Sequence, residues 1–321
     1  MTSPKRGAAD DPLRRGTASE PATVGGLVSY VRGRLRAAGT SEPDIEARLL
    51  VQQALGLNTA QLLSASRDAV PPGALKRLAG PLSRRLKREP LPYILGTREF
   101  YGRALFVDRR VLIPRPETEL LVERALEFSE QLAQRHSAGR PATLRRGQGL
   151  RTADVGTGSG ALAITLALEL PGARVFATDI SEDALDVARR NAEALGASGR
   201  VTFLRGDLLE PLEGQFDIVV SNPPYVASAT LGSGEPELAC EPRLALDGGP
   251  DGLAVIRRLI FALPGILKPD ASVALIEVDP LTAPGAASLA RQAMPSANVE
   301  VLPDLAGLAR CVEIRTGKAS T

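Results

Sequence analysis

Residues 152–170 read TADVGTGSGALAITLALEL, an apolar strand, a glycine loop and an apolar helix in direct succession. Gly156, Gly158 and Gly160 allow the backbone to turn tightly and to approach a ligand closely. Their spacing is GxGxG, which differs from the GxGxxG of dinucleotide-binding folds and lacks the GK[ST] of a P-loop. The stretch therefore predicts a strand–loop–helix unit that opens an α/β domain with a ligand at its glycine loop.

Strands and helices continue to alternate from this unit to the end of the chain, which predicts a doubly wound, mostly parallel sheet of seven strands. The final two strands are expected to form an antiparallel edge. The six strands predicted after the glycine loop are 173–179, 201–207, 216–221, 271–278, 299–303 and 311–315.

The residues that precede the α/β domain do not show this alternation of strands and helices. Residues 1–22 are polar and predict a disordered tail, and residues 23–88 carry apolar side chains at three- and four-residue spacing, which predicts a small helical domain. Residues 89–115 are expected to form a connecting hairpin or linker. The α/β domain is then expected to span residues 116–317.

Composition excludes several classes of function. The net charge of +2 does not suggest a general nucleic-acid binder. Cys240 and Cys311 are far apart and lack a CxxC, and His136 is the sole histidine, so no disulfide framework, metal site or histidine-based triad is expected. The chain has no apolar run of membrane-spanning length and no secretory h-region, which favours a reducing cytoplasm.

Two acids follow successive strands of the predicted sheet. Asp179 ends the second strand, where a carboxylate can accept from both hydroxyls of a ribose. Asp207 ends the third strand and could accept from an exocyclic amine of adenine, which Leu208 would cover. A nucleoside site without phosphate-binding cations suits S-adenosylmethionine (SAM). The predicted cofactor site comprises Gly156, Thr157, Gly158, Ser159, Gly160, Asp179, Asp207, Leu208 and Asn222.

The fourth strand ends in Asn222-Pro223-Pro224-Tyr225, which is the predicted catalytic tetrapeptide. An amide or aryl amine is a poor nucleophile because its lone pair is delocalised. The Asn222 side-chain oxygen and the Pro223 carbonyl could each accept one hydrogen of such an NH2 group and aim its lone pair at a methyl donor. Tyr225 could stack on the flat group, and the prolines would keep the turn rigid.

The pattern resembles the class I SAM-dependent methyltransferases, and the tetrapeptide resembles the motif of those that modify planar nitrogens. Three further stretches resemble the bacterial protein-(glutamine-N5) methyltransferases of peptide chain release factors. These stretches are EPLPYILGTREFYG (89–102), LIPRPETELLVE (112–123) and EPRLALDGGPDGL (241–253). The resemblance covers roughly residues 25 to 315. It implies methylation of the glutamine in the Gly-Gly-Gln (GGQ) loop of release factors one and two, a substrate-docking role for the helical domain, and a monomer.

The resemblance also places Arg115 and residues 117–119 at the rim of the site. Two segments depart from the family pattern: Glu277-Val278-Asp279-Pro280 stands where Glu-x-Gly is common, and residues 227–240 are poor in basic residues. A basic cluster in the helical domain could help to dock a negatively charged partner, although a solvated helix face is the favoured interpretation. Its members are Lys76, Arg77, Arg84, Arg85, Lys87 and Arg88.

Three other functions fit parts of the pattern. A ribosomal RNA or DNA amino-methyltransferase would use the same tetrapeptide on a base. A non-catalytic SAM-binding module would keep the glycine loop but would not require Asn222. A nicotinamide-dependent dehydrogenase is disfavoured by the glycine spacing.

Overall fold

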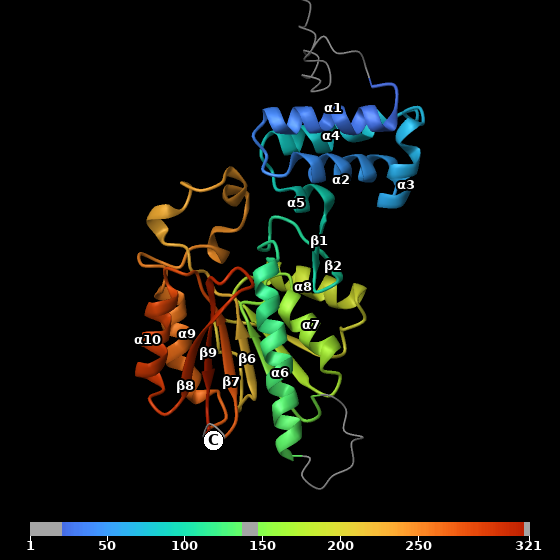
Figure 1. Cartoon of the computed structure of the whole chain (residues 1–321). Coiled ribbons are helices and arrows are strands. Elements are labelled where there is room, and N and C mark those ends of the chain that lie inside the picture. Colours follow the sequence, from blue (N-terminus) through green and yellow to red (C-terminus); the bar gives the residue numbers. More distant parts are fainter. Residues whose placement is uncertain (1–20, 137–146, 318–321) are drawn as a thin grey trace, which may run out of the picture. The chain divides into compact units, whose positions relative to one another are not determined.

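The computed structural model describes residues 21–136 and 147–317, so nearly all of the predicted tail lies outside the described residues. Contacts divide the chain into two compact units, Met1–Gly96 and Thr97–Thr321. The boundary falls within the segment 89–115 that the sequence marks as a connection. Figure 1 shows the elements of both units.

The first unit is helical. Thr23 caps its first helix by accepting from the Gly26 amide, and Asn58 and Gln61 form a reciprocal capping box at the third. Leu27, Leu50 and Leu78 lie in its fully buried core. The helices are α1 (Val24–Ala37), α2 (Pro43–Leu55), α3 (Thr59–Ser64), α4 (Ala74–Leu86) and α5 (Leu91–Leu95).

The predicted basic cluster is largely engaged within this unit. Arg85 is buried and forms a two-bond ion pair with Glu46, both bonds 2.8 Å long. Arg84 pairs with Glu89, and the Arg77 guanidinium donates to a carbonyl of α2. These arginines therefore hold the helices together, which leaves fewer cations for binding a partner.

The second unit is built on a seven-stranded sheet in the order β5-β4-β3-β6-β7-β9-β8. The first five strands in this order are parallel, and β9 runs antiparallel to both of its neighbours. The predicted mostly parallel sheet with an antiparallel edge is thus confirmed. The strands are β3 (Arg151–Val155), β4 (Arg174–Asp179), β5 (Val201–Arg205), β6 (Ile218–Ser221), β7 (Val273–Glu277), β8 (Asn298–Pro303) and β9 (Ala309–Arg315).

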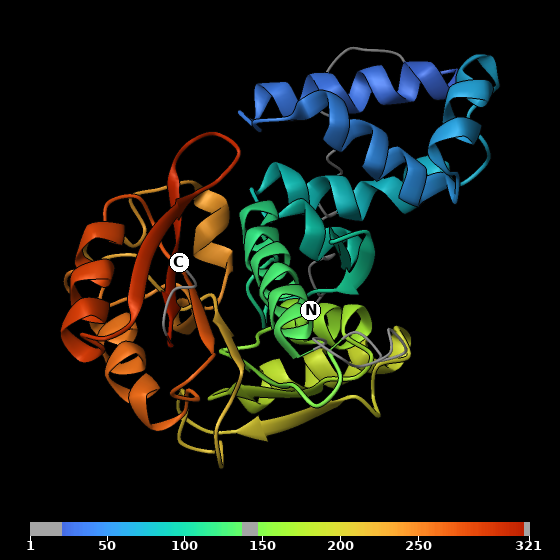
Figure 2. The same cartoon turned by 60° about the horizontal axis from the view of Figure 1, so that its bottom comes forward.

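Helices cover both faces of the sheet (Figures 1 and 2). One buried cluster packs α9 (Ala254–Ala262) and α10 (Ala283–Ala293) against the sheet. The opposite cluster includes side chains of α6 (Glu119–His136), α7 (Ala161–Glu169) and α8 (Glu182–Ala194). A hairpin of β1 (Thr97–Phe100) and β2 (Arg103–Phe106) precedes α6. Within residues 21–136 and 147–317, no helix is both long and apolar enough to span a bilayer.

The strand order places the polar motifs together. The chain moves outward from β3 to β4 and β5, and then crosses to β6 on the other side of β3. Ligands of such sheets bind at this reversal, outside the carboxyl ends of the strands. The glycine loop follows β3 and the catalytic tetrapeptide follows β6, so both lie at the reversal.

Candidate active site

The glycine loop forms one wall of a pocket at the carboxyl ends of β3, β4 and β6. Gly156 and Gly158 have positive φ angles, and a Cβ atom at either would meet no atom within 4 Å, so both face open space. Gly160 differs because its Cβ would lie 2.7 Å from the Ile164 side chain. Gly160 therefore permits close packing at the start of α7, whereas Thr157 and Ser159 line the pocket with the other two glycines.

Asp179, at the end of β4, is fixed by the backbone around it. One carboxylate oxygen accepts from the Gly158 amide and the other from the Ser181 amide, both at 2.9 Å. Burial raises the pKa of the Asp179 carboxyl above its ordinary value. The Asp179 side chain lines the pocket, and its role toward a ribose stays a prediction.

Asp207 and Leu208 also line the pocket, after β5. Asp207 has a partner that the sequence did not suggest, because Arg258 of α9 donates to it at 2.5 Å. Leu208 has a φ of +51°, an unusual conformation for a residue with a side chain, and its carbonyl accepts from the Thr178 hydroxyl at 2.8 Å. These contacts fix the corner that the sequence assigns to the adenine.

Asp154 is a pocket residue that the sequence reasoning missed. One of its carboxylate oxygens accepts from the Thr157 hydroxyl at 2.6 Å and the Ala163 amide at 3.0 Å. The other oxygen is buried and has no hydrogen-bond partner among residues 21–136 and 147–317, and burial raises the pKa of the carboxyl to about 7. Its position at the end of a buried strand, directly before the glycines, was the available signal.

The tetrapeptide divides between the pocket and the core. Asn222 and Pro224 line the pocket, whereas Pro223 and Tyr225 do not. The Asn222 amide nitrogen donates to the Thr118 hydroxyl at 3.1 Å, which leaves its oxygen available to a ligand. The Tyr225 ring packs against the core, and its hydroxyl donates to Glu277 at 3.3 Å. Stacking of Tyr225 on a substrate stays a prediction.

The segment after η5 (Arg243–Ala245) holds the tetrapeptide from outside. The Val226 amide donates to the Leu246 carbonyl, and the Val226 carbonyl accepts from the Gly248 amide. A Cβ at Gly248 would lie 2.8 Å from the Pro224 carbonyl oxygen, and one at Gly252 would lie 2.5 Å from the Tyr225 carbonyl oxygen. The glycines of LALDGGPDGL thus allow backbone to pack on backbone.

Glu241 connects two of the stretches that resemble the family, residues 112–123 and residues 241–253. Its buried carboxylate accepts from the Ile113 amide at 3.0 Å and from the Arg115 guanidinium at 2.5 Å. Glu119 accepts from the Tyr101 amide at 2.7 Å, while Glu117 is exposed. Of the residues predicted at the rim, Thr118 in η2 (Pro116–Thr118) is the one that lines the pocket.

Both segments that depart from the family pattern adopt defined local structures. Asp279 accepts from the Leu281 amide, and Asp279 and Thr282 exchange hydrogen bonds just before α10, so the atypical IEVDP segment leads from β7 toward that helix. Residues 227–240 contain two short 3₁₀ segments, η3 (Ser228–Thr230) and η4 (Pro236–Cys240).

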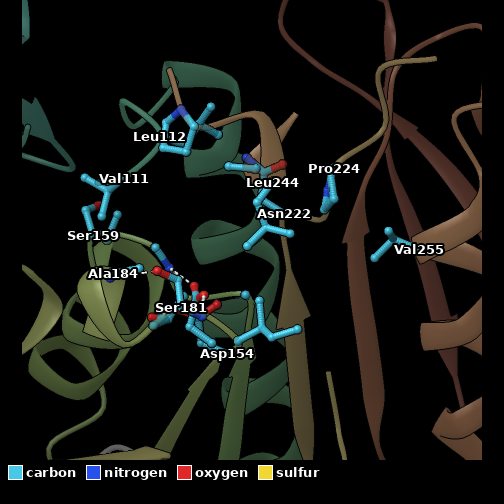
Figure 3. A pocket seen from close by; sticks show the side chains of 18 of the residues that line it. Val111, Leu112, Asp154, Ser159, Ser181, Ala184, Asn222, Pro224, Leu244 and Val255 are labelled. Atoms are coloured by element: carbon cyan, nitrogen blue, oxygen red, sulfur yellow. Dashed lines mark hydrogen bonds between the residues drawn. The ribbon is translucent and has the colours of Figure 1, made fainter. Parts of the chain in front are cut away.

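Apolar side chains complete the pocket (Figure 3). Asn222 and Asp154 reach it from the ends of neighbouring strands, and Leu112 and Leu244 lie on its far side from Asp154. Val255 of α9 lines another part of the wall. A pocket with one unpaired buried carboxylate, a glycine loop and a rigid amide suits a nucleoside cofactor beside a planar nitrogen.

The sheet order and this site define a class I methyltransferase. A family model described as "Methyltransferase small domain" matches residues 141–234, and one described as "PrmC N-terminal domain" matches residues 27–96. The catalytic domain of hMettl16, solved in complex with a MAT2A 3'UTR hairpin, has a TM-score of 0.50 and 16% identity over 74% of this chain and 83% of its own. That likeness concerns the fold alone.

Curated relatives define the family. The release factor glutamine methyltransferase of Moorella thermoacetica is 42% identical over 87% of this chain and 93% of its own length. The protein of that name from Deinococcus radiodurans is 40% identical over 90% of this chain and 97% of its own length. The chain belongs to the release factor glutamine methyltransferase family.

Proposed function

We propose that this protein transfers a methyl group from SAM to the side-chain amide nitrogen of the glutamine in the GGQ loop of peptide chain release factors. The observation that carries the proposal is the orientation of Asn222. Its amide nitrogen is already engaged by Thr118, so its oxygen is the atom offered to a substrate. An oxygen there accepts from an NH2 group, which a glutamine amide presents.

The chemistry required of the protein is positioning. A glutamine amide nitrogen has a delocalised lone pair, and methylation gives that nitrogen positive charge before a proton is lost to water. Acceptance of one N–H by the Asn222 oxygen and of the other by the Pro223 carbonyl favours this charge and aims the lone pair. A preorganised hydrogen-bonding group of this kind contributes about a hundredfold to a thousandfold in rate in other enzymes.

The pocket residues fit SAM, which supplies an electrophilic methyl group when bound. The open space over Gly156 and Gly158 gives room for a ligand against the backbone. Asp179 would accept from the ribose hydroxyls, and the Asp207–Leu208 corner would hold the adenine. The unpaired oxygen of Asp154 would accept from the ammonium group of the methionine part.

The same tetrapeptide could hold an exocyclic amine of ribosomal RNA or DNA, which is the alternative function. Sequence identity of 42% over most of both chains to a release factor glutamine methyltransferase favours the protein substrate. We further propose release factors one and two as partners of a monomeric enzyme, docking on the helical domain. A cytoplasmic location follows from substrates that act in translation.

Mass spectrometry of a release factor after incubation with the protein and SAM tests the proposal. One added methyl group is expected on the GGQ glutamine, and none on a release factor in which alanine replaces that glutamine. Labelled SAM with ribosomal RNA or DNA provides the second arm. Label in nucleic acid, with an unmodified release factor, would establish the alternative.

A further inference from the structure

A series of connected side chains runs from Asn222 through Thr118, at the pocket wall, to a buried glutamate. The Asn222 amide nitrogen donates to Thr118 at 3.1 Å, and the Thr118 hydroxyl favours the ionised form of the Glu277 carboxyl by donating toward it. Tyr225 donates to the same Glu277 carboxylate. Glu277 is the last residue of β7 and is 1% exposed, and its second oxygen has no hydrogen-bond partner in the part of the chain that the structure describes. Three separate segments thus converge on one buried carboxylate.

The hydrogen bonds that connect Asn222, Thr118 and Glu277 can all form with one assignment of donors and acceptors. An ionised carboxylate only accepts, so the Thr118 hydroxyl uses its single proton on Glu277. The Thr118 oxygen must then accept. Of the two polar atoms in the Asn222 side chain, the nitrogen can donate to it and the oxygen cannot. A reversed Asn222 amide would set its oxygen against the lone pairs of Thr118 and would turn its NH2 group toward the substrate NH2.

The surroundings of Glu277 bear on its charge. Burial raises the pKa of its carboxyl to about 7, although the Thr118 and Tyr225 hydroxyls and Arg310 favour the ionised form. Glu117 opposes ionisation, and Cys311, paired with Glu277 across β7 and β9, is kept in its neutral form by burial, which raises its pKa. A proton on Glu277 would let it donate to Thr118 and would remove the preference for one amide orientation.

We propose that Glu277 and Thr118 are positioning residues that lock the Asn222 amide with its oxygen toward the substrate. The proposal rests on the proposed function, since it concerns how Asn222 presents an acceptor to a glutamine amide. It assigns a role to the threonine within RPETE and to the glutamate at the end of β7. Neither residue is required to touch the substrate for this role.

Thr118→Val removes the hydroxyl and keeps the shape of the side chain. We expect kcat with a GGQ release factor to fall by about tenfold to a hundredfold, because a misplaced catalytic group costs up to about a hundredfold. KM for the release factor and the Kd of SAM, measured by calorimetry, are expected to change little. Thr118→Ser restores the hydroxyl and is expected to recover most of the lost kcat.

Thr316→Val is the matched control. The Thr316 hydroxyl is also part-buried and bonded, to the Lys268 carbonyl at 2.7 Å, but it lies beside Ser272 at the opposite end of β7. This control is expected to keep the wild-type kcat. A wild-type kcat in the Thr118→Val protein would overturn the inference. The proposed function would still stand, provided that the wild-type protein methylates the release factor.

Glu277→Gln tests the same positioning role if the Thr118→Val protein does not fold. The ionised form of Glu277 is the productive one, so the wild-type kcat should rise with pH through about 7. A glutamine at position 277 could also donate to Thr118, so it would not enforce one orientation of the Asn222 amide. Glu277→Gln should therefore have a lower kcat, and that kcat should not rise with pH through about 7. An unchanged pH profile in the variant would overturn the inference, and absence of methylation by the wild-type protein would instead overturn the proposed function.

Discussion

The two walls of the pocket are assembled in different ways. The cofactor wall, around the glycine loop and Asp179, is held by hydrogen bonds from the backbone of its own loops. The tetrapeptide wall is held by residues distant in sequence, such as Thr118 and Gly252. One wall is therefore a local structure, whereas the other depends on the complete domain. Substitutions should separate the two walls kinetically.

Replacement of Asn222 should have the largest effect. Asn222→Ala removes the proposed acceptor, and kcat is expected to fall by about a hundredfold to a thousandfold. The Kd of SAM should change much less, because the cofactor wall is built independently. Steady-state kinetics and calorimetry measure the two values. Asn298→Ala, at an exposed position in β8, is the control, and near-normal turnover by Asn222→Ala would refute the assigned role.

Gly252→Ala should damage the tetrapeptide wall without touching the ligand. Its Cβ would lie 2.5 Å from the Tyr225 carbonyl oxygen, so the turn must shift. We expect about a hundredfold lower kcat with a nearly unchanged Kd of SAM. Gly232→Ala is the matched control, since Gly232 also has a positive φ but its Cβ would meet no atom within 4 Å. Equal losses in both variants would indicate backbone strain alone.

Asp179→Ala tests the cofactor wall. Loss of one hydrogen bond to a charged group, worth about 1.5–3 kcal/mol, should weaken SAM binding by at least roughly tenfold to a hundredfold. At saturating SAM, kcat should stay near the wild-type value, which is the reverse of the Asn222→Ala result. Asp186→Ala, on the exposed side of α8, controls for loss of charge. Unchanged SAM affinity in Asp179→Ala would contradict the ribose assignment.

The smallest expected effect concerns Asp154. Its carboxyl has a pKa of about 7, and the ionised form is the one that would attract an ammonium group. The ratio of the SAM Kd of Asp154→Asn to that of the wild type should therefore rise by up to about tenfold from about pH 6 to about pH 8. Using the ratio cancels titration of SAM itself. A ratio independent of pH would exclude this contact.

The same difference between the walls explains what the sequence could predict. The sheet, the glycine loop and the acids after β4 and β5 depend on period and spacing over a few residues, so they could be recognised directly. Thr118 and Glu277 contribute through contacts between segments more than 100 residues apart, as the separation of 104 between Thr118 and Asn222 shows. Arg258 could not be assigned to Asp207 either, because 51 residues separate the two in the sequence. Asp154 lay within the quoted stretch and was missed because its unpaired oxygen is visible only in three dimensions.

Glu241 has a consequence for the order of folding. Its ion pair joins residues separated by 126 positions, so it closes a loop that contains β3, β4, β5 and β6. Closing such a loop before its contents are folded would cost chain entropy without a compensating contact. We expect this closure to come late in folding. A nascent chain would then acquire its cofactor loop before it acquires a complete active site.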